Sequence, residues 1–188
     1  MLEVELKALV TNLDDLIKKL QVFSSEPYVE INYEDIYFDQ NNQLSKNEKE
    51  LRLRKKYFPK KNESTFLLTY KDPPFDSFSR SKPEFETEIA DLENGIAILE
   101  KLGYTISTEY EKHCKLFQVD YKNLHIEVTL ATIPKLNQTF IEVESQTNQS
   151  TDTEQIFKIL KNLLLDLGVN KNQWTNEYYI EAIKKLTD

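Results

Sequence analysis

The feature that most restricts the fold of this chain is a strict alternation of charged and apolar side chains. It is clearest in residues 2–10, where Glu3, Glu5 and Lys7 are separated by single apolar residues. Successive side chains of a β-strand point to opposite faces, so the three charged groups share one face. We therefore expect a strand whose two carboxylates lie ~7 Å apart, with an ammonium group one step further along.

The same period-two pattern recurs along the chain. It predicts strands over residues 2–10, 28–39, 50–58, 65–71, 84–90, 104–120, 124–131 and 139–146. Helical spacing and capping residues predict helices over residues 12–23, 91–102, 151–167 and 175–186. No repeat or interior boundary is visible. We therefore predict one α+β domain, residues 1–188, with an antiparallel sheet that curls or closes on itself.

Composition narrows the classes of function. The formal net charge of −8 disfavours a nucleic-acid-binding protein, and no apolar run is long enough to span a membrane. A single cysteine, Cys114, excludes an internal disulfide and a thiolate zinc site. With no signal peptide in the sequence, we expect a cytoplasmic protein. Basic residues gather in residues 52–56, which indicates a defined anionic ligand.

Other predicted strands also carry charged residues on one face. Any single charged face of this kind is more often a solvated sheet surface. Taken together, and if the sheet closes, they bring acidic first and last strands opposite a basic wall. Oxygen ligands of that kind suit Mg²⁺ or Mn²⁺, and arginines suit phosphate oxygens. The residues concerned, besides the first strand, are Arg52, Arg54, Lys71, Glu84, Glu86, Glu142 and Glu144.

The order of these residues along the chain resembles the sequence pattern of the CYTH, or triphosphate tunnel metalloenzyme, superfamily. The superfamily includes class IV adenylate cyclases, thiamine triphosphatases and inorganic triphosphatases. The segments that carry the resemblance are Glu3–Lys7, Asp35–Asp39, Leu51–Arg54, Thr69–Lys71, Glu84–Glu86, Leu102–Tyr104 and Phe140–Glu144. Each segment is weak alone, but their order along nearly the whole chain is specific.

The resemblance implies a closed eight-stranded antiparallel β-barrel, or tunnel, with flanking helices, a bound Mg²⁺ or Mn²⁺ ion and a triphosphate substrate. It implies metal ligands at Glu3, Glu5, Glu142 and Glu144, and catalytic roles for Glu3, Glu5, Lys7 and Lys71. It also implies that the phosphate groups of the substrate are bound by a set of residues that comprises Lys7, Arg52, Arg54, Lys71, Arg80, Glu84, Glu86, Lys112 and Lys115.

The branch that the chain resembles most is class IV adenylate cyclase, which converts ATP to cyclic AMP and pyrophosphate. Two alternatives stay open. One is a hydrolase that releases phosphate from inorganic, thiamine or nucleoside triphosphate. The other is a module that binds polyphosphate or a nucleotide without turnover. The resemblance is also compatible with a homodimer.

Two positions depart from the family pattern. Cys114 stands where a basic residue is usual, which leaves Lys112 and Lys115 as the nearest cations. The segment around Ala131 lacks the usual aspartate and two glycines. Glu127 either lines the tunnel and partly replaces that aspartate, or forms a surface ion pair. These departures affect the reaction and leave the predicted fold unchanged.

Overall fold

The computed structural model describes residues 2–24, 26–74, 82–147 and 152–186, and eight strands form one antiparallel sheet. The strand order is β1-β8-β7-β6-β2-β3-β4-β5. The strands are β1 (Leu2–Leu9), β2 (Val29–Asp39), β3 (Glu50–Phe58), β4 (Glu63–Lys71), β5 (Glu84–Ile89), β6 (Thr105–Tyr121), β7 (Leu124–Ile133) and β8 (Gln138–Thr147). The helices are α1 (Leu13–Phe23), α2 (Gln43–Lys46), α3 (Leu92–Lys101), α4 (Thr153–Asp166) and α5 (Tyr179–Lys184).

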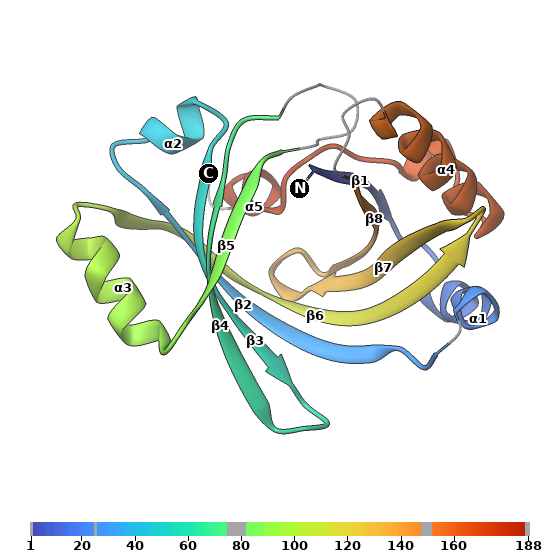
Figure 1. Cartoon of the computed structure of the whole chain (residues 1–188), viewed down its shortest axis with the longest axis horizontal. Helices are drawn as coiled ribbons and strands as arrows, with labels where there is room; N and C mark the ends of the chain where they lie inside the picture. Colours follow the sequence, from blue (N-terminus) through green and yellow to red (C-terminus); the bar gives the residue numbers. More distant parts are fainter. Residues whose placement is uncertain (1, 25, 75–81, 148–151, 187–188) are drawn as a thin grey trace.

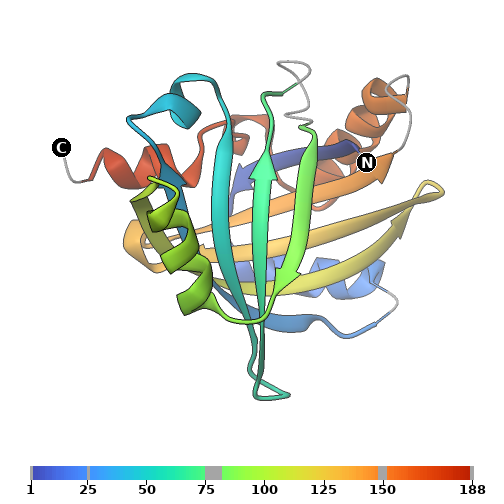
Figure 2. The same cartoon turned by 60° about the vertical axis from the view of Figure 1, so that its left-hand side comes forward.

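The sheet is strongly curled, as Figure 1 shows, and Figure 2 shows the same curvature from the side of β3, β4 and β5. The predicted α+β fold is thereby confirmed. Strands β1 and β5 are the two edges, and within the described chain no backbone ladder joins them. Side chains cross the seam instead: Lys71 Nζ lies 3.8 Å from Glu3 Oε1 and 3.1 Å from Glu84 Oε2. The barrel that we expected is a half-barrel completed by side chains.

On β1, β3, β6, β7 and β8, apolar side chains face outward, toward the helices. Helices α1 and α4 cover the outer face of β1, β6, β7 and β8, where Val4, Phe117, Leu160 and Leu164 belong to one buried cluster. Helix α3 covers the outer face of β3, where Leu53 and Leu99 are buried together. Because the outer face is the apolar one, the charged face of the sheet is turned inward.

The last predicted helix is shorter than expected. We predicted residues 175–186, but α5 begins at Tyr179, after an extended segment. That segment runs along the free edge of β1: Trp174 forms a bridge with Ala8, and the Thr175 N–H donates to the Lys7 carbonyl over 2.9 Å. These contacts hold Trp174 and Thr175 in an extended conformation along the edge of β1, so the helix begins later in the chain.

None of the described helices is long and apolar enough to cross a bilayer.

Candidate active site

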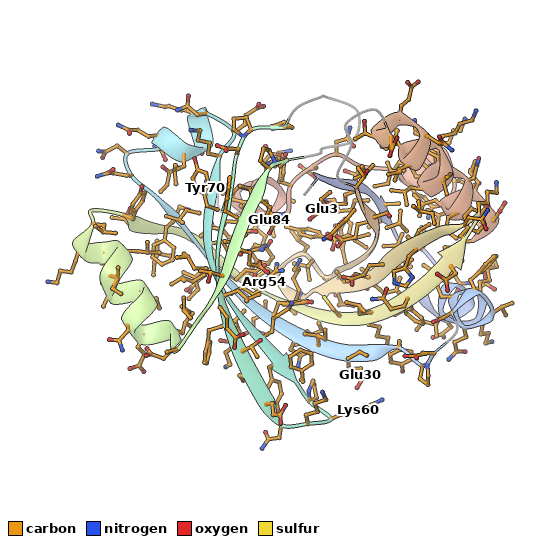
Figure 3. All side chains as sticks on the ribbon, viewed as in Figure 1. Glu3, Glu30, Arg54, Lys60, Tyr70 and Glu84 are labelled. Atoms are coloured by element: carbon orange, nitrogen blue, oxygen red, sulfur yellow. The ribbon has the colours of Figure 1, made fainter. Side chains whose placement is uncertain are left out.

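The inward face of the sheet surrounds a cavity of about 450 Å³. Figure 3 shows Glu3, Glu84 and Arg54 around this hollow, whereas Glu30 and Lys60 lie at the periphery. All eight strands and the segment leading into α5 contribute side chains. The lining consists of Glu3, Glu5, Lys7, Tyr33, Tyr37, Glu50, Arg52, Arg54, Lys56, Lys71, Lys82, Glu84, Glu86, Tyr110, Lys112, Glu127, Thr129, Glu142, Glu144, Gln146, Tyr178, Tyr179 and Ile180.

One wall of the cavity is acidic because three neighbouring strands place carboxylates in register. Glu5 on β1 is opposite Glu144 on β8, and Glu144 is also opposite Glu127 on β7. One step further along, Lys7 is opposite Glu142, which faces Thr129 on its other side. Like charges directly opposite one another on a sheet destabilise it, so this row of carboxylates favours a ligand of positive charge.

The pKa values of this wall show the same excess of negative charge. The pKa of Glu144 is raised well above its ordinary value by burial and by the carboxylates of Glu3 and Glu5. Burial also raises the pKa of Glu3 to about 7, although Lys71 acts in the opposite direction. For Glu142 the balance is reversed: burial would raise its pKa, but Lys112 and Lys7 lower it.

The chemistry of this wall fits a hard divalent cation, because its donors are carboxylate oxygens and its carboxylates outnumber the ammonium group of Lys7. Glu5, Glu144 and Glu127 come from adjacent strands in register. In the described parts of the chain, no three such groups are already arranged around a single point as metal ligands would be. Binding an ion here would therefore require glutamate side chains to change rotamer.

The opposite wall is basic and is organised by a buried aspartate. Asp35 is 1% exposed and accepts from Arg54 Nε and Nη2 over 2.5 and 2.7 Å, with Arg52 Nη1 3.8 Å away. Although burial would raise its pKa, the two arginines hold the pKa of Asp35 well below its usual range. This forked pair fixes the orientation of Arg54.

Arg52 is also buried, at 7% exposed, and its hydrogen bonds are long. Its terminal nitrogens lie 3.4 Å from the Tyr37 hydroxyl and 3.5 Å from the Thr69 hydroxyl. Within the described structure its Nε has no hydrogen-bond partner. A buried guanidinium with unused donors beside a cavity is suited to an anion.

The floor of the cavity is covered by the C-terminal segment. Lys7 Nζ lies 4.0 Å from the centroid of the Tyr179 ring, and Lys112 Nζ lies 5.4 Å from it. Lys7 also donates to the Glu177 carbonyl. Tyr179 packs against Phe140 on the inner face and is buried with Ile183 of α5. Two of the predicted phosphate-binding lysines therefore lie beneath an aromatic ring of α5.

Of the predicted site residues that the structure describes, all but Lys115 line the cavity. Lys115 points to the outer face, where its ammonium group lies 3.2 Å from Glu30 Oε1, so it does not compensate for the missing basic residue at Cys114. Arg80 lies outside the described residues.

The departures at Cys114 and Ala131 lie together on the inner face. Cys114 is opposite Ala131, and Ala131 is opposite Phe140, so these small residues belong to an apolar layer closed by α5. Ala131 is a step away from the acid pair, and it is Thr129 that faces Glu142. Glu127 lines the cavity, where it accepts from Gln118 Nε2 over 3.0 Å. Of the two readings left open for Glu127, the structure supports the tunnel.

Sequence reasoning did not single out several lining residues. Lys56 continues the alternation of Arg52 and Arg54, and Glu50 precedes it, so strand parity could have identified both. The residues contributed by the C-terminal segment, Tyr178 and Tyr179, carry no local signal, because their place depends on a long-range contact with β1.

A half-barrel of eight antiparallel strands with an acidic and a basic inner wall defines a protein built around a charged tunnel. The CYTH domain matches residues 1–179 of this chain. The chain therefore belongs to the CYTH domain family.

Individual relatives span nearly all of the chain. "Putative adenylate cyclase MJ0240" of Methanocaldococcus jannaschii is 25% identical over 182 residues, which are 96% of this chain and 98% of that protein. The structure of the PH1819 protein of Pyrococcus horikoshii has 27% identity and a TM-score of 0.86, covering 98% of this chain and 99% of that one. A Hippeastrum protein described as a "putative adenylyl cyclase" with "a dominant triphophatase activity" is 16% identical with a TM-score of 0.68, covering 98% and 95%. At that identity, the last likeness concerns the fold alone.

Proposed function

We propose that this protein is a metal-dependent enzyme that cleaves a triphosphate held in the tunnel, and that it acts as a triphosphate hydrolase. The observation that carries the proposal is that cations on the basic wall have donors or charges without a hydrogen-bond or ion-pair partner among the described residues. Arg52 has an unpartnered buried donor. Lys112 lines the cavity, and among the described residues it has no carboxylate within ion-pair distance.

The basic wall would bind the phosphate groups, and the acidic wall would bind the metal ion. Arg52, Arg54 and Lys112 would bind phosphate oxygens, with Arg54 held in place by Asp35. Lys71, at the seam between Glu3 and Glu84, would neutralise charge on the phosphate group nearest β1. Glu86, which accepts from the Thr69 hydroxyl over 2.8 Å, would fix that hydroxyl beside Arg52. Positioning and charge stabilisation of this kind are the main contributions of proteins to phosphoryl transfer.

The acidic wall would hold Mg²⁺ or Mn²⁺, with Glu3, Glu5, Glu142 and Glu144 as ligands. Such an ion supplies positive charge to the phosphate chain and lowers the pKa of water. The excess of negative charge around Glu144 supports this assignment.

Hydrolysis is favoured over cyclisation because the cavity is polar. Ile180 is the single aliphatic side chain in the described lining, and the tyrosines there are engaged with cations or with one another. A nucleobase site normally offers an apolar slot with a few polar groups. The second candidate, an adenylate cyclase, rests on the name of the Methanocaldococcus relative.

The test is a product assay with purified protein and Mg²⁺ or Mn²⁺. ATP, inorganic triphosphate and thiamine triphosphate are supplied separately, and phosphate, pyrophosphate and cyclic AMP are quantified. Phosphate from inorganic triphosphate is the expected result. Cyclic AMP with equimolar pyrophosphate from ATP would establish the cyclase instead, and tight binding without product would identify a binding module.

Arg52→Gln gives the matched variant. Loss of a charge-assisted hydrogen bond, worth about 1.5–3 kcal/mol, lowers kcat/KM by roughly 10- to 100-fold. Lys55→Gln is the control, since Lys55 lies on the same strand but pairs with Glu34 outside the cavity. Equal losses in the two variants would show that the basic wall does not bind the substrate.

A further inference from the structure

The cationic groups of Arg54, Lys56 and Lys112 surround the ring of Tyr33. The distances to the ring centroid are 4.4 Å from Arg54 Cζ, 5.5 Å from Lys112 Nζ and 5.9 Å from Lys56 Nζ. Tyr33 is 7% exposed, so the ring is a fixed support for all three. They come from two strands that flank β2, on which Tyr33 is opposite both Lys56 and Lys112.

The carboxylates nearby leave much of this positive charge unbalanced. Asp35 is committed to Arg54 through two hydrogen bonds and approaches Arg52 at 3.8 Å. Within the described chain, no carboxylate lies within 4 Å of the ammonium groups of Lys56 or Lys112. By contrast, Glu50 at the other end of β3 is paired with Lys82 over 2.6 Å. The unpaired charge is thus concentrated toward Lys56.

The spacing shows that Lys56 adds length to the anion site. Arg52, Arg54 and Lys56 occupy successive inward positions of β3, so the first and last are ~13 Å apart at a rise of about 3.3 Å per residue. An extended triphosphate is shorter than that span. When Arg52 and Arg54 bind a triphosphate, Lys56 lies beside the position that a fourth phosphate group of a longer chain would occupy.

We propose that Lys56, positioned by Tyr33, forms a further phosphate subsite that makes the tunnel selective for linear inorganic phosphate chains longer than triphosphate. This inference rests on the proposed function and extends it to the class of substrate. The chemistry that would be recognised is a tetraphosphate or longer chain with no organic group attached at the Lys56 end.

Calorimetric titration with inorganic triphosphate, inorganic tetraphosphate and ATP, in metal-free buffer so that no ligand is hydrolysed, tests the proposal. We expect the wild-type protein to bind tetraphosphate about tenfold more tightly, as one additional hydrogen bond to a charged group allows. Lys56→Ala removes that difference and leaves triphosphate affinity unchanged, whereas Lys56→Arg retains it. Tyr33→Leu reduces the ratio of the two affinities, which a loss of stability alone does not alter.

Lys55→Ala is the control, because Lys55 is the preceding residue on the same strand and pairs with Glu34 outside the cavity. Unchanged melting temperatures establish that each variant is folded. Equal weakening of both ligands in Lys56→Ala overturns the proposal and makes Lys56 part of the triphosphate grip. A loss confined to ATP also overturns it, since Lys56 would then serve the organic end. If the wild-type protein binds no triphosphate at all, the proposed function itself fails; binding without chain-length selectivity rejects this inference alone.

Discussion

Replacement of Asp35 by asparagine tests whether one buried carboxylate organises the basic wall. Asp35 is 1% exposed, and its two oxygens bind Arg54 over 2.5 and 2.7 Å. Asparagine has the same shape but no charge, so Asp35→Asn leaves the guanidinium groups of Arg54 and Arg52 buried without a counter-ion. Breaking a buried pair in this way costs about 3–5 kcal/mol.

Because asparagine keeps one acceptor oxygen, we expect a loss at the lower end, about 3 kcal/mol. In a domain of this size each kcal/mol shifts the melting temperature by about 2–4 °C, so the decrease is about 6–12 °C. Urea unfolding and calorimetry measure the two quantities. Glu34→Gln is the matched control: Glu34 is the preceding residue, exposed and paired with Lys55, and its loss costs at most ~1 kcal/mol.

The pH dependence supplies an independent check. The pKa of Asp35 is lower in the folded protein than its unfolded value of about 3.9. Its contribution to stability is therefore complete above the unfolded pKa and declines as the pH falls toward the folded pKa. The difference between the wild type and Asp35→Asn narrows below about pH 4. If the variant costs no more than Glu34→Gln, or if the difference stays constant between pH 6 and pH 2.5, Asp35 does not have this role.

Three further outcomes are expected. Glu144 has a raised pKa, so the metal-free protein loses stability as the pH rises above about 4.3. Glu144→Gln reduces that loss, to which Glu3 with its pKa of about 7 also contributes. The variant also reduces the stabilisation by added Mn²⁺, and both effects are read from melting curves; an unchanged Mn²⁺ response would exclude Glu144 as a ligand. Burial raises the pKa of Cys114 to about 12, so at pH 8 its reaction with a thiol reagent is more than about a thousandfold slower in folded than in unfolded protein. Lys115→Ala leaves triphosphate binding unchanged, whereas Lys112→Ala weakens it about tenfold; titration calorimetry distinguishes the two.

The fold and the inward faces of the strands could be predicted because the side-chain period of a strand is two. Once Glu3 and Glu5 face inward, the parity of every other residue on β1 follows. The same rule separates Lys112, which lines the cavity, from Lys115, three positions later on the opposite face. Parity was therefore sufficient to reject Lys115, and sequence reasoning did not apply it there.

Other parts of the site depend on contacts that no local pattern encodes. Asp35 reaches Arg54 because β2 lies beside β3. Tyr179 reaches Lys7 because the chain after α4 returns along the free edge of β1. The contact between Glu3 and Lys71 joins the edge strand β1 to β4, which lies beside the other edge strand and is separated from β1 by most of the strand order. Sequence patterns show which face a residue occupies, whereas these pairings depend on the order and curvature of the whole sheet.

The two walls also indicate the composition of the ligand. If the charges of the cavity served stability alone, acid and base would pair, as Lys82 and Glu50 do over 2.6 Å. Instead the pKa of Glu144 is raised among other carboxylates, while Lys56 on the basic wall has no carboxylate within ion-pair distance among the described residues. The carboxylates around Glu144 and the cations around Lys56 each lack sufficient charge of the opposite sign, and Lys56 and Lys112 lie beside the rings of Tyr33 and Tyr179. A ligand that satisfies both walls must contain both signs of charge, which a phosphate chain with its divalent cation does and which neither component does alone.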